Sequence, residues 1–169
     1  DINEINDLKK FVTEKDAIVL SDEVYEKIIF SEKRMISPAS VEGLKERTIT
    51  VNGFSKTYAM TGWRLGYLAA PSNYIAVINK LHIHTHTGTS PFIQEAATIA
   101  FKCVEEVEEM RKQYETRRNL FLGKLNTIPH LKVIMPEGAF YAWVKFDIPN
   151  MDSLQFALWL LNEAHVLGI

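Results

Sequence analysis

The strongest constraint on the fold is a set of short apolar runs that end directly before polar side chains. The first, Ala17–Leu20, is continuous and leads straight into Ser21 and Asp22. An unbroken apolar run of this length is typical of a strand buried on both faces of a parallel sheet. We therefore expect an α/β fold in which helices flank a mainly parallel sheet.

Two further strands are expected downstream. Residues Arg47–Val51 alternate threonine and isoleucine, and Leu65–Ala70 is closed by Pro71. Both patterns are typical of strands. Helical spacing or helix-start residues predict helices over 5–15, from Ser72, from Ser90–Pro91, over 105–125 and after Asp152.

The pattern changes near residue 105, which predicts a domain boundary there. Residues 1–104 alternate strands with helices, and residues 105–169 continue as a charged helix, two strands and a further helix. The two strands are expected over 131–135 and 139–146, joined at Pro136–Gly138, and a last strand is expected to start at Val166. The apolar stripe expected on the charged helix consists of Val107, Met110, Tyr114, Phe121 and Leu125.

Composition excludes several classes of protein. The net charge of −2 carries no basic or acidic block, so neither a nucleic acid nor a membrane surface is expected as a partner. The single cysteine, Cys103, excludes an internal disulfide framework. No apolar run is long enough for a membrane helix, and no secretory signal is seen, so a cytoplasmic location is expected.

Chemically active side chains follow the first two strands. Asp22 and Tyr25 come after the first strand, Ser55 and Lys56 after the second, and Arg64 lies shortly before the third. Functional groups gather beyond the carboxyl ends of parallel strands in open α/β sheets. We therefore expect a carboxylate, a phenol, a hydroxyl, an amine and a guanidinium to share one edge.

One cofactor, pyridoxal 5'-phosphate (PLP), uses this whole set of groups. Its aldehyde condenses with a lysine amine, and its ring nitrogen stays protonated beside a carboxylate. Its phenolic oxygen accepts a hydrogen bond from a donor such as tyrosine. Its phosphate binds hydroxyls, backbone N–H groups and an arginine fork.

Three stretches carry a resemblance to a known family. IVLSDEVYEKIIF, TVNGFSKTYAMTGWRLGYLAAP and PEGAFYAWVKF, in this order, resemble the fold-type I PLP-dependent aminotransferases of class I/II, the aspartate and aromatic amino acid aminotransferases. The resemblance implies that Lys56 forms the Schiff base with the cofactor. It implies that Asp22 pairs with the pyridine nitrogen and Tyr25 with the phenolic oxygen. Ser55 and Arg64 would then hold the phosphate.

The resemblance also implies an arrangement of domains and partners. Residues 1–104 match the second half of the PLP-binding large domain, and residues 105–169 match part of the small C-terminal domain. The chain is thus expected to lack the N-terminal part and the C-terminal end, and to be incomplete for activity. A homodimer acting on amino acids and 2-oxo acids is implied for the intact enzyme. Some members carry a serine where this chain has Gly53, whose backbone N–H could substitute.

Several alternatives stay open at this stage. A PLP-dependent lyase or synthase would use the same anchoring residues, and a catalytically inert fragment would keep them unused. His82, His84 and His86 would share a face on a strand and could then bind a metal. They are expected to end a helix, where alternate residues do not share a face, so no metal site is predicted.

Aromatic residues near the motif have ordinary structural explanations. Trp63 and Tyr58 are expected to pack in the core. Phe140 and Tyr141 lie on an expected strand, so at least one of them should pack in the core. In the family this strand comes near the substrate, so the other could line the pocket.

Overall fold

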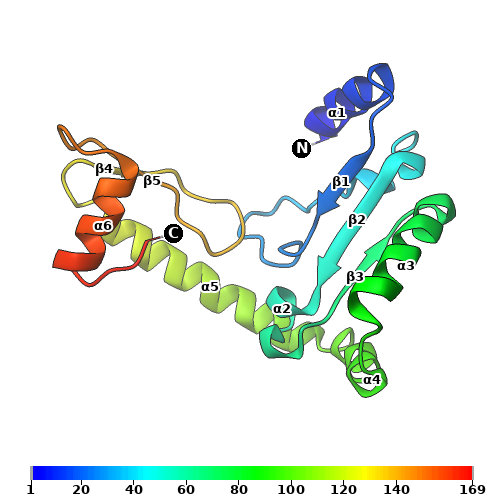
Figure 1. Cartoon of the computed structure of the whole chain (residues 1–169). Coiled ribbons are helices and arrows are strands. Elements are labelled where there is room, and N and C mark those ends of the chain that lie inside the picture. The colour runs from blue at the N-terminus through cyan, green and yellow to red at the C-terminus, as the bar shows by residue number, and fades with distance from the viewer. Residues whose placement is uncertain (1, 169) are drawn as a thin grey trace. The chain divides into compact units, whose positions relative to one another are not determined.

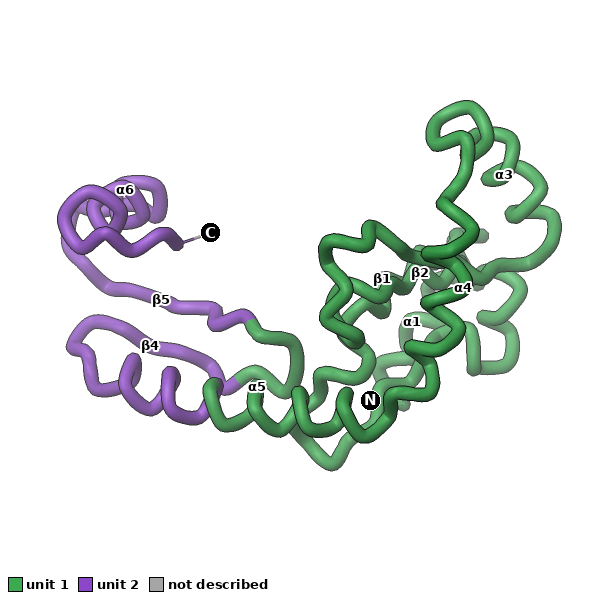
Figure 2. Tube along the Cα trace, turned by 90° about the horizontal axis from the view of Figure 1, so that it is seen from below, with its two compact units in different colours: residues 1–117, 136–140 green, residues 118–135, 141–169 purple. Residues whose placement is uncertain are grey.

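The computed structural model describes residues 2–168, which form two compact units. Figure 2 colours them separately. Unit 1 contains the residues up to 117 together with 136–140, and unit 2 contains 118–135 and the residues from 141 onward. The division expected at residue 105 concerns the domains of the longer family fold, and it stays a prediction.

The sheet of unit 1 has three strands in the order β1-β2-β3 (Figure 1). They are β1 (Val19–Asp22), β2 (Thr48–Gly53) and β3 (Gly66–Ala69). β1 pairs with β2 in parallel, and β2 pairs with β3 in antiparallel register. All three strands occur where the sequence predicted them, to within two residues, and the first pair is parallel as the α/β expectation requires.

The expectation that β1 is buried on both faces is wrong for this chain. Its residues alternate between half-buried and exposed, and Leu20 is 69% exposed. Among the described strands, β1 pairs only with β2 and lies at an edge of the sheet. An edge strand keeps part of its surface open to water unless another element covers it.

Helices of unit 1 precede and follow the strands. They are α1 (Ile2–Glu14), η1 (Pro38–Ser40), η2 (Lys45–Arg47), α2 (Phe54–Thr57), η3 (Thr61–Trp63), α3 (Ser72–His86), α4 (Pro91–Ala100) and the first part of α5 (Val104–Leu125). α4 begins at Pro91 after Ser90, as predicted, because proline suits a position whose N–H has no helical partner. α3 begins at Ser72, but Pro71 occupies the cap position and no side chain caps it.

In the core of unit 1, α4 packs against the segment that follows β2. Phe54, Leu65, Ala97 and Ala100 form a buried cluster, against which Tyr58 packs. The Phe101 ring lies 5.1 Å from the Phe54 ring, at a 64° angle that aromatic pairs favour. Tyr58 therefore packs as predicted, whereas Trp63 is 46% exposed. This cluster fixes the turn that carries Lys56.

Unit 2 contains the end of α5 and a small hairpin with a helix. β4 (Leu131–Val133) pairs antiparallel with β5 (Val144–Phe146), and α6 (Ser153–Glu163) follows. Leu122 is the buried residue of α5, and Phe121, placed in the stripe by sequence, is 54% exposed. The strand expected from Val166 does not form within the described residues.

The last helix, α6, begins as predicted. Asp152 accepts a hydrogen bond from the Gln155 N–H at 2.8 Å, and the Asp152 N–H donates to the Gln155 side chain at 2.9 Å. This reciprocal capping box satisfies two backbone donors at the helix start. No helix in the described range 2–168 combines the length and the apolar character needed to cross a bilayer.

Candidate cofactor site

Lys56 lies on the short helix α2, directly after β2. Its neighbours Phe54 and Thr57 are 3% and 2% exposed, so both sides of the turn are buried. The Phe54 N–H donates to the Leu65 carbonyl at 3.2 Å, which ties the turn to the start of β3. Lys56 itself is half-buried. A buried turn of this kind restricts where the lysine side chain can reach.

The amine of Lys56 faces aromatic rings. Its Nζ lies 5.1 Å from the centre of the Phe140 ring and 5.8 Å from that of the Tyr25 ring. Tyr25 and Phe140 pack edge to face with ring centres 5.2 Å apart. These distances are those of cation–π contacts. Within the described residues the amine makes no hydrogen bond and no ion pair, so it is open to a further partner.

Asp22 is the last residue of β1 and pairs with Val51 of β2. Its Oδ1 accepts a hydrogen bond from the Val24 N–H at 3.2 Å, and the residue is exposed. Asp22 thus lies at the carboxyl end of the parallel pair. Lys56 follows β2 at this same end. The carboxylate has room for another hydrogen-bond donor.

The next residue, Glu23, is the buried acid of this region. It is 5% exposed, and its Oε1 accepts hydrogen bonds from the Ser21 hydroxyl at 2.9 Å and the Ser37 hydroxyl at 2.6 Å. Buried carboxylates need such partners. Sequence reasoning did not single out Glu23. Because its oxygen is already occupied by two serines, we assign it a structural role.

Arg64 has a left-handed backbone, with φ of 51° and ψ of 46°. This conformation is uncommon for a non-glycine residue, but Ala59 and Ala139 also adopt a positive φ, so it does not by itself mark Arg64 as functional. One guanidinium nitrogen donates to the Thr61 carbonyl at 2.9 Å. Among residues 2–168 no carboxylate pairs with Arg64, so the remaining donors of its fork are free for an anion. Ser55 is half-buried on α2.

Gly53 does not offer the donor that was expected of it. Its backbone N–H donates to the side-chain oxygen of Asn52 at 2.7 Å. The glycine has a different structural use, because β2 and β3 approach closely where Gly53 pairs with Gly66. A Cβ added to Gly66 would lie 3.0 Å from the Asn52 carbonyl oxygen.

The structure brings Lys56 and Tyr25 into contact and places Asp22 at the same end of the sheet. Arg64 follows η3, next to Leu65, whose carbonyl binds the Lys56 turn. Among residues 2–168, Lys56 supplies an amine without a polar partner, Asp22 a carboxylate, and Arg64 a guanidinium with donors left over beyond its bond to Thr61, and these match the groups that PLP requires. The residues therefore fit the cofactor by their chemistry. Their individual roles toward it stay predictions.

The family model for aminotransferase class I and II matches residues 1–168. The chain belongs to this family. Enzymes of the family depend on PLP, which confirms the cofactor expected from the sequence. The α/β fold expected from the resemblance is confirmed by solved structures of the family.

The chain resembles aspartate and aromatic aminotransferases in particular. It is 46% identical to the aspartate aminotransferase of Pyrococcus abyssi, covering 98% of this chain and 42% of that protein. It is 42% identical to aromatic-amino-acid aminotransferase 2 of Thermococcus litoralis, covering 100% of this chain and 43% of that protein. The chain thus spans less than half the length of these relatives.

Solved structures give the same result. The aromatic aminotransferase from Pyrococcus horikoshii OT3 matches with a TM-score of 0.92 at 45% identity, covering 98% of this chain and 45% of that chain. The aspartate aminotransferase from Rhizobium meliloti matches with a TM-score of 0.86 at 32% identity, covering 95% of this chain and 43% of that chain.

The three histidines lie at the end of α3. The His82 and His86 rings stack with centres 5.4 Å apart, as residues one helical turn apart do. His84 lies between them in sequence, on another side of the helix. Among the described residues, no group of three or more histidine, cysteine or acidic side chains could hold a metal ion.

Two residues near the site were not recognised from sequence as functional candidates. Tyr114 was placed in an apolar stripe, and Arg111 was counted among the charges of α5. The spacing of Glu108, Arg111 and Glu115 was the available pattern, because residues three and four apart share a helix face. Both residues contact segments that lead to Lys56, as described below.

Proposed function

We propose that this chain carries the lysine-bearing part of a PLP-dependent amino acid aminotransferase. The supporting observation is the family match along the chain, with the Lys56 amine held against the Tyr25 and Phe140 rings. The relatives named above are aspartate and aromatic aminotransferases. We propose aspartate or an aromatic amino acid as the amino donor and a 2-oxo acid as the acceptor.

Each residue of the site has a defined role in this proposal. Lys56 Nζ would hold the cofactor, and as a free amine it would take a proton from the substrate α-carbon as general base and give that proton back as general acid. Asp22 holds the proton on the ring nitrogen, which favours the electron-accepting form. Tyr25 donates a hydrogen bond to the phenolic oxygen, and Ser55 and Arg64 bind the phosphate. When bound, the cofactor would supply an electron sink for the negative charge that develops at the substrate α-carbon.

The proposal extends to the assembly and location of the protein. We propose that the intact enzyme is a homodimer, because enzymes of the family build their active sites between two subunits. We also propose that it is a cytoplasmic enzyme of amino acid metabolism. The absence of a membrane-spanning helix among the described residues is compatible with this location.

The function is tested on the protein in its natural full length. After PLP is added, we expect a visible absorbance band that is lost in Lys56→Ala and kept in Lys80→Ala. Lys80 is an exposed lysine of α3 and serves as the matched control. We then expect a new 2-oxo acid from aspartate or an aromatic amino acid only when a second 2-oxo acid is supplied.

Two results would overturn the proposal. An absorbance band that persists in Lys56→Ala would place the cofactor elsewhere. Release of ammonia without an acceptor would identify an elimination reaction in place of transamination.

A further inference from the structure

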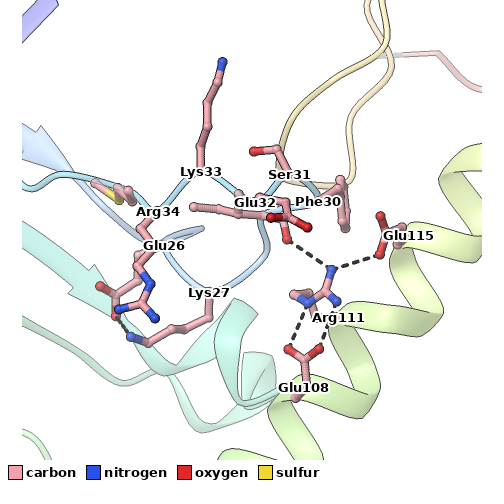
Figure 3. A pocket seen from close by; sticks show the side chains of 12 residues that line it. Glu26, Lys27, Phe30, Ser31, Glu32, Lys33, Arg34, Glu108, Arg111 and Glu115 are labelled. Atoms are coloured by element: carbon pink, nitrogen blue, oxygen red, sulfur yellow. Dashed lines mark hydrogen bonds and ion pairs between the residues drawn. The ribbon is translucent and has the colours of Figure 1, made fainter. Parts of the chain in front are cut away.

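Arg111 links the first part of α5 to the loop that follows β1 through a hydrogen bond to Ile29. Its guanidinium donates to both Glu108 oxygens at 2.9 Å, to Glu115 at 3.0 Å and to the Ile29 carbonyl at 3.2 Å (Figure 3). The Arg111 side chain is 21% exposed, so these charge-assisted bonds are partly shielded from water. The side chains of Glu108, Arg111 and Glu115 line one side of a cavity of about 740 Å³ in unit 1. This anchoring sets the position of α5 relative to Ile29.

The same Ile29 pairs with Gly138. The Phe30 N–H donates to the Glu137 carbonyl and the Ala139 N–H donates to the Ile28 carbonyl, both at 2.8 Å. A Cβ on Gly138 would lie 2.9 Å from the Ile28 carbonyl oxygen, so only glycine fits at this approach. The residues 136–140 are therefore held against the loop that Arg111 also binds.

Tyr114 closes this set of contacts. It lies one helical turn after Arg111 and stacks on Phe140, with ring centres 5.3 Å apart and planes 27° apart. Phe140 in turn packs on Tyr25 and lies 5.1 Å from the Lys56 amine. α5 therefore contacts this region at two points. Arg111 binds Ile29, which pairs with Gly138, and Tyr114 stacks on Phe140, two residues after Gly138.

We propose that Tyr114 is a positioning residue for Lys56, acting through Phe140. This inference rests on the proposed function, in which Lys56 Nζ must reach the cofactor. The Phe140 ring stacks on the Tyr114 ring and packs edge to face with the Tyr25 ring, so two aromatic contacts set its orientation. Without the Tyr114 ring, Phe140 can turn away, and the lysine amine then loses the nearer of its two ring partners.

A purely structural role for Tyr114 would give different results. If Tyr114 only stabilised α5, its loss would lower stability and leave the environment of Lys56 unchanged in the folded protein. If it acts through Phe140, the ring matters and the hydroxyl does not. Tyr114→Phe should then behave as the wild type, and Tyr114→Leu should not.

The test measures how fast Lys56 reacts with a trace of acetic anhydride in the cofactor-free, full-length protein. Peptide mass spectrometry gives the rate for Lys56 relative to the exposed Lys80. We expect this ratio to rise about two- to fivefold in Tyr114→Leu, the factor that corresponds to one exposed cation–π contact. Tyr114→Phe should keep the wild-type ratio, as should the control Tyr74→Leu on α3.

A double variant tests the route of the effect. Phe140→Leu should raise the ratio by itself, and adding Tyr114→Leu should raise it no further. Additive effects of the two substitutions, or an unchanged ratio in folded Tyr114→Leu, would overturn the inference. If Tyr114→Leu does not fold, Tyr114→Gln takes its place, because Tyr114 is only partly buried and glutamine favours helix.

The outcome is separable from that of the proposed function. Failure of PLP to attach to Lys56 in the wild type refutes the function. Normal attachment with a Lys56 reactivity that does not respond to Tyr114→Leu refutes only the positioning role.

Discussion

Gly138→Ala should destabilise unit 1 strongly, although it adds a single methyl group. The added Cβ would lie 2.9 Å from the Ile28 carbonyl oxygen, closer than a methyl group and a carbonyl oxygen can approach. The segment must shift, which strains or breaks the two 2.8 Å hydrogen bonds that flank the glycine. Overpacking costs about 1–3 kcal/mol, and each weakened backbone hydrogen bond adds about 1 kcal/mol. With two such bonds weakened, we expect a total loss of about 3–5 kcal/mol.

Gly123→Ala provides the matched control. Gly123 lies on α5, and a Cβ added there would meet nothing within 4 Å. Alanine is favoured over glycine in a helix by about 1 kcal/mol, so this variant should be slightly more stable than the wild type. The same chemical change is therefore expected to have opposite signs at the two positions.

Urea unfolding gives the global effect, and hydrogen exchange gives the local one. In Gly138→Ala the amides of Phe30 and Ala139 should exchange faster, because these two N–H groups donate across the pairing. Equal stability of the two alanine variants, or unchanged exchange at both amides, would refute the close approach at Gly138.

Three further predictions address other parts of the chain. Asp152→Ala should lose about 1 kcal/mol of stability in unit 2, measured by urea unfolding, because it removes the side-chain half of the α6 capping box, and Asp152→Asn should restore most of it. The Arg111 hydrogen bonds lower the pKa of Glu108, so the stabilising effect of Glu108 should be complete above the usual glutamate range and fade as the pH falls through the lowered folded-state pKa. Unfolding of wild type and Glu108→Gln across acidic pH measures this, and a difference that grows on acidification contradicts it. Burial raises the pKa of Tyr58 and of Tyr67, so both should stabilise the fold below the usual tyrosine range and cease to do so as the pH rises through the raised values; an alkaline absorbance titration with both tyrosines in the ordinary range would contradict this.

Local patterns in the sequence predicted the positions of most elements. The apolar runs located all three strands of unit 1, and Pro91 and Asp152 marked helix starts correctly. These features depend on neighbouring residues alone, through backbone preferences and side-chain hydrogen bonds. The Lys56 motif was equally visible, because it is a continuous stretch between two strands.

Features that depend on distant residues were not predictable in the same way. The exposure of β1 depends on which elements lie over it, and a continuous apolar run does not encode that. On α5, Leu120, Phe121 and Leu122 are consecutive apolar residues, so helical periodicity could not choose the buried one. The contacts of Arg111 and Tyr114 join segments that are far apart in sequence, and these segments meet only in the folded chain.

The central claim is that Lys56 is the residue to which PLP becomes attached. The most direct measurement is peptide mapping by mass spectrometry of the full-length protein after incubation with PLP and reduction with borohydride. We predict the added cofactor mass on the peptide that contains Lys56, and its loss in Lys56→Ala. Cofactor mass on a different lysine peptide, or undiminished labelling of Lys56→Ala, would contradict the account.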